Sequence, residues 1–589
     1  MNRAMLESKN AAYAYLLYSG IATVLFFYFL LIVDPRLIYV AQQPVFFYDW
    51  DFFASHLDRP GGLVDWLAKF IGQFFTSAVF GALLLTCVIV AFAFIVRRLY
   101  GMFSRQVHWN GEWLVAAPLA VLTGEYFFPI RYVLALLLVL CTAVVFSHIS
   151  RSWKEYQRAL FFLVLVAFLY YLVQAIALLL PFLQLADREN LRTKRLPTLV
   201  AFFAAAAVTP FLISRMIPQN PQSLFFGLVP EPVTEKQKVF LIACIILFIV
   251  PLAVSKCHAE RFRLSPPVLP LLGLLIALAS WFYLFDSKVK TVLQVELFAE
   301  NRQWAPLIQL TDRRPDVNHR LVILHRYRGL YFTGQLGERL FERPLEGPDG
   351  LYRSDRTALE YPLDYCDLLI DLGHVNGALH KAYEAWAVEG ETPRVLRRLA
   401  FLHLAKKEFS AAGKYLSRLE KTGKMRPWLK RYQEICQQRS LQKDAELLRL
   451  SLFAEKADFL MRPGFASAEL KEIARTQPNR AALEYLLAYE LLAGRLDAFM
   501  TDLPAYLQLN AELPRNFEEA VILYLNSGLP TTAEQREIAV RRSTLEAFAD
   551  FIRILQLHGN DKRSAYKELG KYGRTFWFYF LYLDKGAEK

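Results

Sequence analysis

The chain has 589 residues, of which 55% are hydrophobic and only 21% are Asp, Glu, Lys or Arg. Its 46 Phe, 29 Tyr and 10 Trp exclude an intrinsically disordered chain, because such chains lack the aromatic surface that a folded core buries. Charged residues fall mostly after residue 286, which predicts an apolar membrane domain over residues 1–286 and a soluble domain over residues 287–589. The net charge is +13, but the basic residues form no dense block, so we do not expect nucleic-acid binding.

The first domain is predicted to be a multipass transmembrane helical domain. Its apolar segments reach about the 20 residues that a spanning helix needs, except one that Pro118 and Gly124 interrupt. The interrupted segment, 112–128, is predicted to form a hairpin with the segment that follows it. We therefore expect seven or eight spans, near residues 13–33, 70–96, 112–128, 130–148, 159–186, 197–216, 239–255 and 267–286.

Basic loops predict the orientation of these spans, because Lys and Arg collect on the cytoplasmic side of a membrane. Strict alternation over eight spans places the soluble domain inside but leaves the basic loops at 187–195 and 256–263 outside. A helix break near Gln174 could keep segment 159–186 from crossing the membrane as one span. Both basic loops would then lie on the cytoplasmic side. The soluble domain then lies outside the cell, and we favour this second solution.

The loop at residues 34–69 is the most informative stretch of the first domain. It places Asp49, Asp51, His56 and Arg59 among many aromatic residues. One interpretation is an aromatic belt at the membrane interface, where Tyr and Trp are common, with solvated carboxylates. The other is a site in which the two Asp are catalytic, by binding a metal or deprotonating an acceptor hydroxyl, and His56 and Arg59 bind substrate.

Helical spacing of apolar residues begins after this loop's Pro60-Gly61-Gly62 turn and alternates with Asp65, Lys69 and Gln73. This pattern predicts an amphipathic helix at the bilayer surface.

Glu125 and Arg131 flank the short turn between segments 112–128 and 130–148. They are predicted to pair with each other, and the alternative is that both contact a substrate. Burying a charge in the membrane costs free energy, so a charged residue kept inside a span is usually functional. That cost is small near the interface, where these two residues are predicted to lie.

The second domain is predicted to be an all-α, TPR-like α-solenoid. Ala378 and Ala412 introduce similar helix pairs 34 residues apart, which is the tetratricopeptide period. Such solenoids usually bind proteins or peptides on an extended concave surface. The six Cys show no spacing typical of zinc sites, and no nucleotide-binding or hydrolase motif is present.

Three stretches carry a family resemblance: Asp34 to Gln73, the turn Gly124–Pro129, and Leu513–Leu525 (LPRNFEEAVILYL). They resemble an uncharacterised family of Bacteroidota multipass membrane proteins, known as a domain of unknown function. This resemblance implies a multipass protein of the bacterial inner (cytoplasmic) membrane, but it brings no activity with it.

A second resemblance is architectural. The order of first span, acidic outer loop, amphipathic helix and second span is similar to that of GT-C glycosyltransferases, which use lipid-phosphate sugar donors. Some of those enzymes carry C-terminal tetratricopeptide repeats. In them an Asp of the first outer loop is a base or metal ligand, which implies that role for Asp49 or Asp51 and a divalent metal as cofactor. This chain departs from that pattern in having fewer spans and no second acidic motif, and a likeness of architecture does not establish chemistry.

Two functional hypotheses follow. The first is a GT-C-like transferase that uses a lipid-linked donor at the outer membrane face. The second is a non-enzymatic, membrane-anchored scaffold whose helical repeats recruit a protein partner to an envelope complex. The sequence names neither the cofactor nor the partner.

The orientation gives the first prediction. Alkaline phosphatase fused after Lys589 should be active, and green fluorescent protein fused there should stay dark, because the C-terminal domain is expected outside the cytoplasm. Fluorescence without phosphatase activity would contradict both this orientation and the incomplete crossing of segment 159–186.

Overall fold

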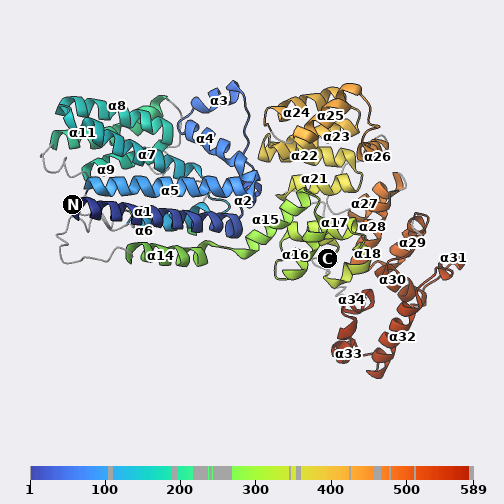
Figure 1. Cartoon of the computed structure of the whole chain (residues 1–589). Coiled ribbons are helices and arrows are strands. Elements are labelled where there is room, and N and C mark those ends of the chain that lie inside the picture. The colour runs from blue at the N-terminus through green and yellow to red at the C-terminus, as the bar shows by residue number, and fades with distance from the viewer. Residues whose placement is uncertain are drawn as a thin grey trace. The chain divides into compact units, whose positions relative to one another are not determined.

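A computed structural model describes residues 2–103, 111–186, 196–216, 268–343, 347–352, 360–423, 426–454, 466–476, 479–509 and 512–582, with a few further residues between 236 and 248. Every regular element within these ranges is a helix (Figure 1). The predicted all-α class is therefore confirmed. Contacts divide the chain into two units, Met1–Ser287 and Lys288–Lys589, one residue beyond the expected boundary.

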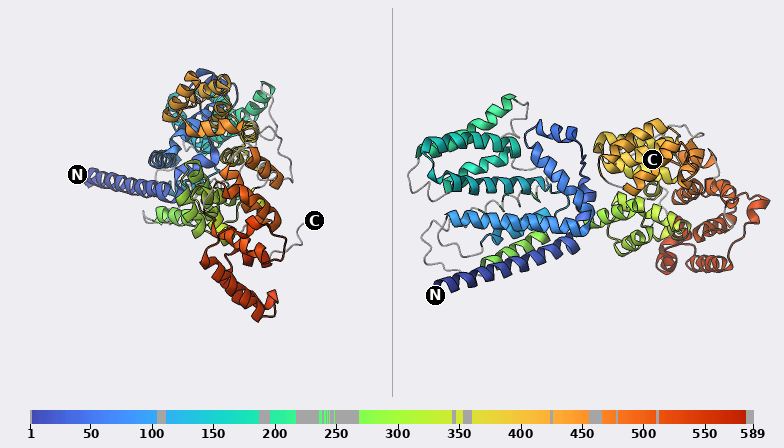
Figure 2. Two further views of the ribbon diagram at one scale, coloured as in Figure 1. Left: turned by 90° about the vertical axis from the view of Figure 1, so that its right-hand side faces the viewer. Right: turned by 45° about the horizontal axis from the view of Figure 1, so that its top comes forward.

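The first unit is built from long helices that lie side by side in Figure 1 and in the right-hand view of Figure 2. Helix α5 packs against α1, α6 and α7, and α8 packs against α11. The long helices are α1 (Asn2–Phe27), α5 (Ala78–Phe103), α7 (Arg131–Ile149), α8 (Glu155–Val173), α11 (Leu196–Met216) and α14 (Val268–Leu284). The shorter helices are α2 (Pro35–Gln42), α3 (Trp50–Leu57), α4 (Gly62–Gly72), α6 (Trp113–Thr123) and α9 (Leu179–Ala186).

Four stretches of the described chain are helical, long and apolar enough to cross a membrane: Tyr15–Val33, Ala78–Met102, Arg131–Ser152 and Glu155–Gln184. A fifth candidate, α14, qualifies only together with the next helix. These are fewer than the predicted seven or eight, but they are counted over the described residues alone. Helix α6 is too short to cross, and α11 is apolar over its described stretch Phe202–Leu212. Most of the expected span at 239–255 and the basic loops at 187–195 and 256–263 lie outside the described residues.

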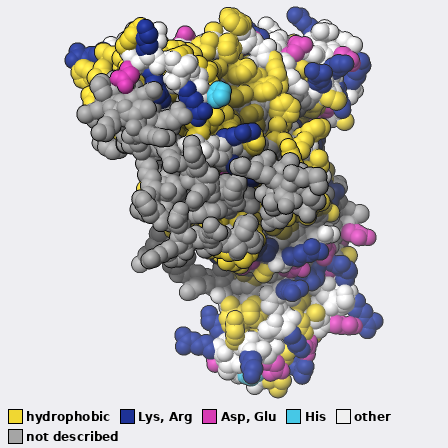
Figure 3. Space-filling model, turned by 60° about the vertical axis from the view of Figure 1, so that its left-hand side comes forward, with side chains coloured by type: hydrophobic (Ala, Val, Ile, Leu, Met, Phe, Trp, Pro, Cys, Tyr) yellow, Lys and Arg dark blue, Asp and Glu magenta, His cyan; other side chains and the backbone are white. Residues whose placement is uncertain are grey.

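Large apolar side chains are exposed on these helices, and Figure 3 shows broad hydrophobic areas on the surface. Phe80, Phe168 and Phe282 are each at least 60% exposed. Aqueous solvent would penalise so much contiguous apolar surface, whereas lipid does not. The exposed residues therefore agree with a membrane-embedded unit.

Helix α6 corrects the predicted hairpin. The turn between α6 and α7 is present, but α6 packs chiefly against α14. Gly273 of α14 makes this contact possible, since a Cβ atom there would lie 2.5 Å from the carbonyl oxygen of Trp113. Nearly every residue of α6 is buried, so this helix is surrounded by protein.

The second unit is a succession of helices in which neighbours along the chain pack together, as α21 does with α22 and α23 with α24. Ala378 and Ala412 are each the fourth residue of a helix, and both are fully buried. Their assignment to a tetratricopeptide repeat stays a prediction. The helices are α15 (Ser287–Glu300), α16 (Trp304–Arg313), α17 (Arg320–Phe332), α18 (Leu336–Arg339), α19 (Pro348–Leu351), α21 (Pro362–Asp371), α22 (Val375–Glu389), α23 (Pro393–Ala405), α24 (Phe409–Glu420), α25 (Arg426–Gln438), α26 (Ala445–Ala454), α27 (Ala466–Thr476), α28 (Arg480–Leu492), α29 (Leu496–Leu507), α30 (Arg515–Leu525), α31 (Ala533–Arg536), α32 (Arg542–Leu557), α33 (Lys562–Leu569) and α34 (Phe576–Tyr582).

Buried ion pairs join α21 to α23. Arg394 Nη2 lies 2.6 Å from Asp364 Oδ1, and Arg398 Nη2 lies 2.8 Å from Asp367 Oδ2. Burial alone would raise the pKa of the Asp367 carboxyl, but Arg398 and its neighbouring arginines hold that pKa well below its usual range. Removing one member would leave an uncompensated buried charge, so these pairs fix how the two helices meet.

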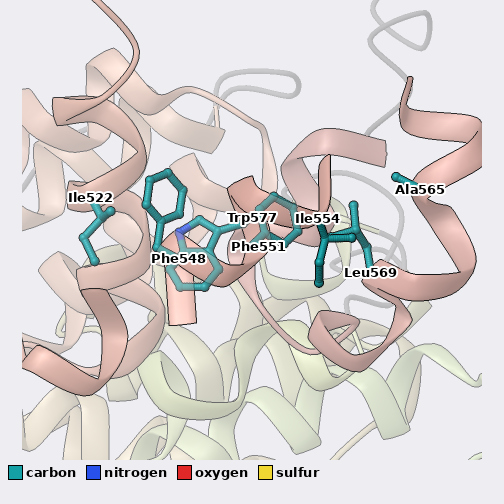
Figure 4. Close-up of a cluster of buried hydrophobic side chains, with 7 residues drawn as sticks. All are labelled: Ile522, Phe548, Phe551, Ile554, Ala565, Leu569 and Trp577. Atoms are coloured by element: carbon teal, nitrogen blue, oxygen red, sulfur yellow. The ribbon is translucent and has the colours of Figure 1, made fainter. Parts of the chain in front are cut away.

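The last helices close the second unit around an aromatic cluster (Figure 4). Trp577 of α34 packs against Phe548 and Phe551 of α32. Its indole nitrogen donates a hydrogen bond of 2.7 Å to the carbonyl oxygen of Glu519. Trp577 therefore anchors the final helix through both its apolar body and its polar edge.

A core substitution tests the helix pairs. Replacing Ala412 by Leu should lower the free energy of unfolding by about 1–3 kcal/mol, because the extra volume overpacks a fully buried contact. The Ser417→Leu variant is the control, since Ser417 is exposed on the same helix. Thermal unfolding of the purified full-length chain measures the difference. Equal melting temperatures for Ala412→Leu and the wild type would remove Ala412 from the tight helix contact.

Candidate functional site

The acidic loop at 34–69 folds into α2, α3 and α4. Asp49 is the N-cap of α3, where its Oδ1 accepts a hydrogen bond of 2.8 Å from the Phe52 amide. Asp51 is exposed in the first turn of the same helix. Both positions suit acidic side chains, because a helix N-terminus presents unpaired N–H groups and partial positive charge. The helix begins at Trp50, so the two Asp do not share one extended strand.

Helix α4 is amphipathic, with its polar side turned inward. The Gln73 side chain just after it is buried and donates a hydrogen bond of 2.9 Å to the Pro44 carbonyl oxygen. Leu67 and Phe74, on the apolar side, are 38% and 39% exposed. A polar face that packs against protein and an apolar face that is exposed suit a helix in contact with lipid.

A cavity of about 150 Å³ lies beside the polar face of α4. Its walls come from the turn before α4, the first turns of α7, and the segment that follows α8. Pockets for drug-sized ligands measure about 300–1,000 Å³. This cavity is smaller, so it suits a compact group such as a phosphate. Its charged and amide-bearing wall residues are Arg59, Asp65, Arg131 and Gln174.

The Asp65 carboxylate is the centre of the charged groups at this cavity. Its Oδ2 lies 2.6 Å from Arg59 Nη2 and 3.2 Å from Lys69 Nζ. His56 Nε2 is 3.6 Å from the same oxygen, and Arg131 Nη1 is 4.0 Å from Oδ1. Three permanent cations thus face one carboxylate. We call this group, with the cavity it borders, the cation site.

His56 is buried and fixes the position of Lys69. The ring Nδ1 lies 2.7 Å from the Phe52 carbonyl oxygen, which only accepts, so Nδ1 carries the proton. Nε2 therefore has a free lone pair and accepts from Lys69 Nζ at 3.3 Å. Burial lowers the pKa of His56, and Lys69 and Arg59 lower it further, while the Phe52 carbonyl and Asp65 oppose them. The imidazole is neutral at physiological pH and adds no charge to the site.

A break in the membrane helix at Gln174 shapes the cavity. Gln174 has a φ of +56°, and α8 ends just before it. Its Nε2 donates a hydrogen bond of 2.9 Å to the carbonyl oxygen of Pro60. The Gly61 amide in turn donates a bond of 2.8 Å to the Tyr171 carbonyl oxygen, which the break leaves without a helical partner. The interruption predicted near Gln174 is present, and it holds the turn that carries Arg59.

The structure brings some of the predicted site residues together. His56, Arg59 and Arg131 converge on the cation site, although Arg131 is distant from the other two in sequence. Asp49 and Asp51 belong to α3 and do not line the cavity. Their catalytic role stays a prediction.

Glu125 corrects one expectation, since it does not pair with Arg131. Its Oε2 accepts hydrogen bonds from the Phe127 amide, at 3.0 Å, and from the side chain of Gln237. Burial raises the pKa of Glu125. Arg131 instead faces Asp65. The Glu125 side chain folds back on its own turn, where nearby amides satisfy it.

Sequence reasoning missed Asp65 and Lys69 as site residues. They were assigned to the polar side of an interfacial helix because they alternate with apolar residues at helical spacing. The available signal was the concentration of Arg59, Asp65 and Lys69 on either side of the Pro-Gly-Gly turn. That pattern does not reveal Arg131, which arrives from a distant segment.

Among the described residues, no group of three or more His, Cys, Asp and Glu side chains could hold a metal ion. At the cation site, Asp65 is surrounded by positive charge, which suits an anion better than a metal ion.

A family comparison covers nearly the whole chain, since the family model matches residues 9–583. The chain belongs to this family, described as "Family of unknown function (DUF6057)". No curated protein and no solved structure matches the chain. Membership in the family agrees with the resemblance to an uncharacterised membrane protein family.

The turn that supports the cavity can be tested at Gly61, whose φ is +77°. Gly61→Ala should lower stability by about 1–2 kcal/mol, because a Cβ is strained in the left-handed region. That Cβ would also lie 3.0 Å from Cδ of Gln174 and push against its bond to Pro60. Gly20→Ala is the control, since no atom lies within 4 Å of its Cβ position. A melting temperature in detergent that is unchanged for Gly61→Ala would show that the turn does not depend on this conformation.

Proposed function

We propose that this protein is a membrane transferase that holds the phosphate of a lipid-linked donor at the cation site. The observation that carries the proposal is the convergence of Arg59, Lys69 and Arg131 on the Asp65 carboxylate, which lines a small cavity together with Arg59 and Arg131. Positive charge in excess, fixed before a ligand arrives, is the arrangement that binds phosphate groups.

The donor class follows from the size and surroundings of the cavity. At about 150 Å³ it accommodates a phosphate group, so the rest of a donor must lie outside it. The exposed apolar side chains of Leu67 and Phe74 flank α4 and suit contact with a lipid chain. A phosphate inside and a hydrocarbon chain alongside together describe a lipid phosphate.

The chemistry of transfer rests on the resemblance to GT-C enzymes. In this proposal Asp49 or Asp51 deprotonates the acceptor or binds a divalent metal. The neutral His56, whose Nε2 accepts from Lys69, positions that cation. The protein then acts in the bacterial inner membrane, with its helical repeats outside the cytoplasm.

A scaffold remains the second candidate, favoured by a shallow groove on α24. The groove is lined by Ser410, Gly413, Lys414, Ser417, Arg418 and Lys421. Its cationic side chains suit an acidic segment of a partner protein. Crosslinking in native membranes that recovers a reproducible partner, lost on substitution of Lys414, would support this candidate over the transferase.

Phosphate binding is tested at Arg131. In nanodiscs of zwitterionic lipid, Arg131→Gln should bind farnesyl phosphate about tenfold or more weakly than the wild type, because a hydrogen bond to a charged group is worth about 1.5–3 kcal/mol. Arg98→Gln is the control, since Arg98 is exposed on α5 and lies over Phe94. Calorimetric titration measures both affinities. Equal affinity of Arg131→Gln and the wild type would overturn the phosphate site.

The catalytic part of the proposal has its own test in a deletion strain. Asp49→Asn and Asp51→Asn keep the side-chain shape but remove its charge, so loss of a general base should lower transfer by about 100-fold or more. Protein levels checked by blot should stay equal. Full complementation by both variants would exclude a catalytic role for these carboxylates and leave only the interfacial interpretation of the loop.

A further inference from the structure

We propose that the cation site prefers a phosphate group with two negative charges to one with a single charge, and that Asp65 limits the binding of both by competing for the same cations. The inference rests on the proposed function, because it concerns the phosphate held in the same cavity. It goes beyond that function by naming the charge state of the ligand and the residue that limits its affinity.

The first step is a charge balance. Arg59, Lys69 and Arg131 contribute three positive charges, and Asp65 removes one. His56 adds none, because its Nε2 is occupied as an acceptor from Lys69. Two positive charges remain without a counter-ion within the described site. A phosphomonoester or a diphosphate diester carries two negative charges and restores neutrality, whereas a simple phosphodiester carries one.

The second step is the uneven distribution of these cations around Asp65. One oxygen, Oδ2, receives the close contacts from Arg59 and Lys69, at 2.6 and 3.2 Å. Arg131 remains 4.0 Å from the other oxygen, beyond hydrogen-bond distance. Its Nη2 donates to the Tyr132 hydroxyl at 2.6 Å, and its buried Nε has no hydrogen-bond acceptor. Arg131 thus presents donors that Asp65 does not satisfy.

These two steps give Asp65 a defined effect on ligands. The carboxylate holds Arg59 and Lys69 in place, but it also competes with any anion for them. Electrostatic attraction scales with the product of the charges, so neutralising Asp65 must strengthen the binding of every anion. A doubly charged anion gains about twice as much binding energy as a singly charged one.

The experiment compares three probes on the full-length protein in zwitterionic nanodiscs. Farnesyl phosphate is doubly charged at pH 8, its methyl ester is singly charged, and inorganic phosphate lacks a lipid chain. The wild type should bind farnesyl phosphate about tenfold more tightly than the methyl ester. Asp65→Asn should tighten farnesyl phosphate binding by a further factor of about ten, with a smaller gain for the methyl ester.

Matched variants keep this test interpretable. Asp65→Glu retains the competing charge and should not tighten binding, and Asp58→Asn removes an exposed charge from the same loop without effect. Asp65→Ser, which is also neutral, replaces the Asn variant if that variant does not fold. Weaker or unchanged binding of farnesyl phosphate to the neutral Asp65 variants would overturn the inference, as would equal wild-type affinity for farnesyl phosphate and its methyl ester.

The outcomes also separate the inference from the proposed function. If Arg131→Gln weakens binding while neutral Asp65 variants do not tighten it, only the inference fails. If inorganic phosphate binds as tightly as farnesyl phosphate and Asp65→Asn tightens both, the charge selectivity stands and the lipid-linked donor is overturned. If the wild type binds none of the three probes, both proposals fail.

Discussion

A charge that leaves water needs a partner, and this constraint determines the interior of both units. In the first unit the mostly buried Asp65 carboxylate has His56 and three partly exposed cations around it. In the second unit it pairs the acidic face of α21 with the basic face of α23, where Arg394 and Arg398 meet Asp364 and Asp367. The two groups differ in their balance of positive and negative charge. The pairs between α21 and α23 match arginines with carboxylates, whereas the cation site leaves positive charge in excess.

The cation site exists because a membrane helix is broken beside it. A continuous α8 would keep the Tyr171 carbonyl oxygen inside its own hydrogen-bond ladder. The break at Gln174 frees that oxygen for the Gly61 amide and turns the Gln174 side chain toward Pro60. Arg59 and Asp65 lie on either side of the turn at Gly61. The helix break at Gln174 and the left-handed Gly61 together hold these charges at the cavity. Irregular backbone at such a place is tolerated when it is buried in protein, and there it commonly forms ligand sites.

Local signals in the sequence predicted the features that depend on local chemistry. Apolar runs predicted the long helices, and a helix break was expected near Gln174, where α8 ends. Features that depend on distant contacts were missed. Nothing near Trp113 shows that Gly273 will pack against it, and nothing near Arg131 shows that Asp65 will face it. An amphipathic pattern gives two faces but not which one meets lipid, so α4 was assigned its charges on the solvent side.

The excess of positive charge is the feature that separates the two proposed functions. A membrane anchor for a scaffold needs its polar groups satisfied, and a second carboxylate near Arg131 would have done this at little cost. The described part of the chain instead leaves Arg131 Nε buried without an acceptor and Arg131 Nη1 at 4.0 Å from its nearest carboxylate. An unsatisfied buried donor lowers stability by about 1–3 kcal/mol, a cost that a bound anion would remove. A site that is incomplete when empty and neutral when filled fits a protein that binds an anionic ligand better than one that serves only as an anchor.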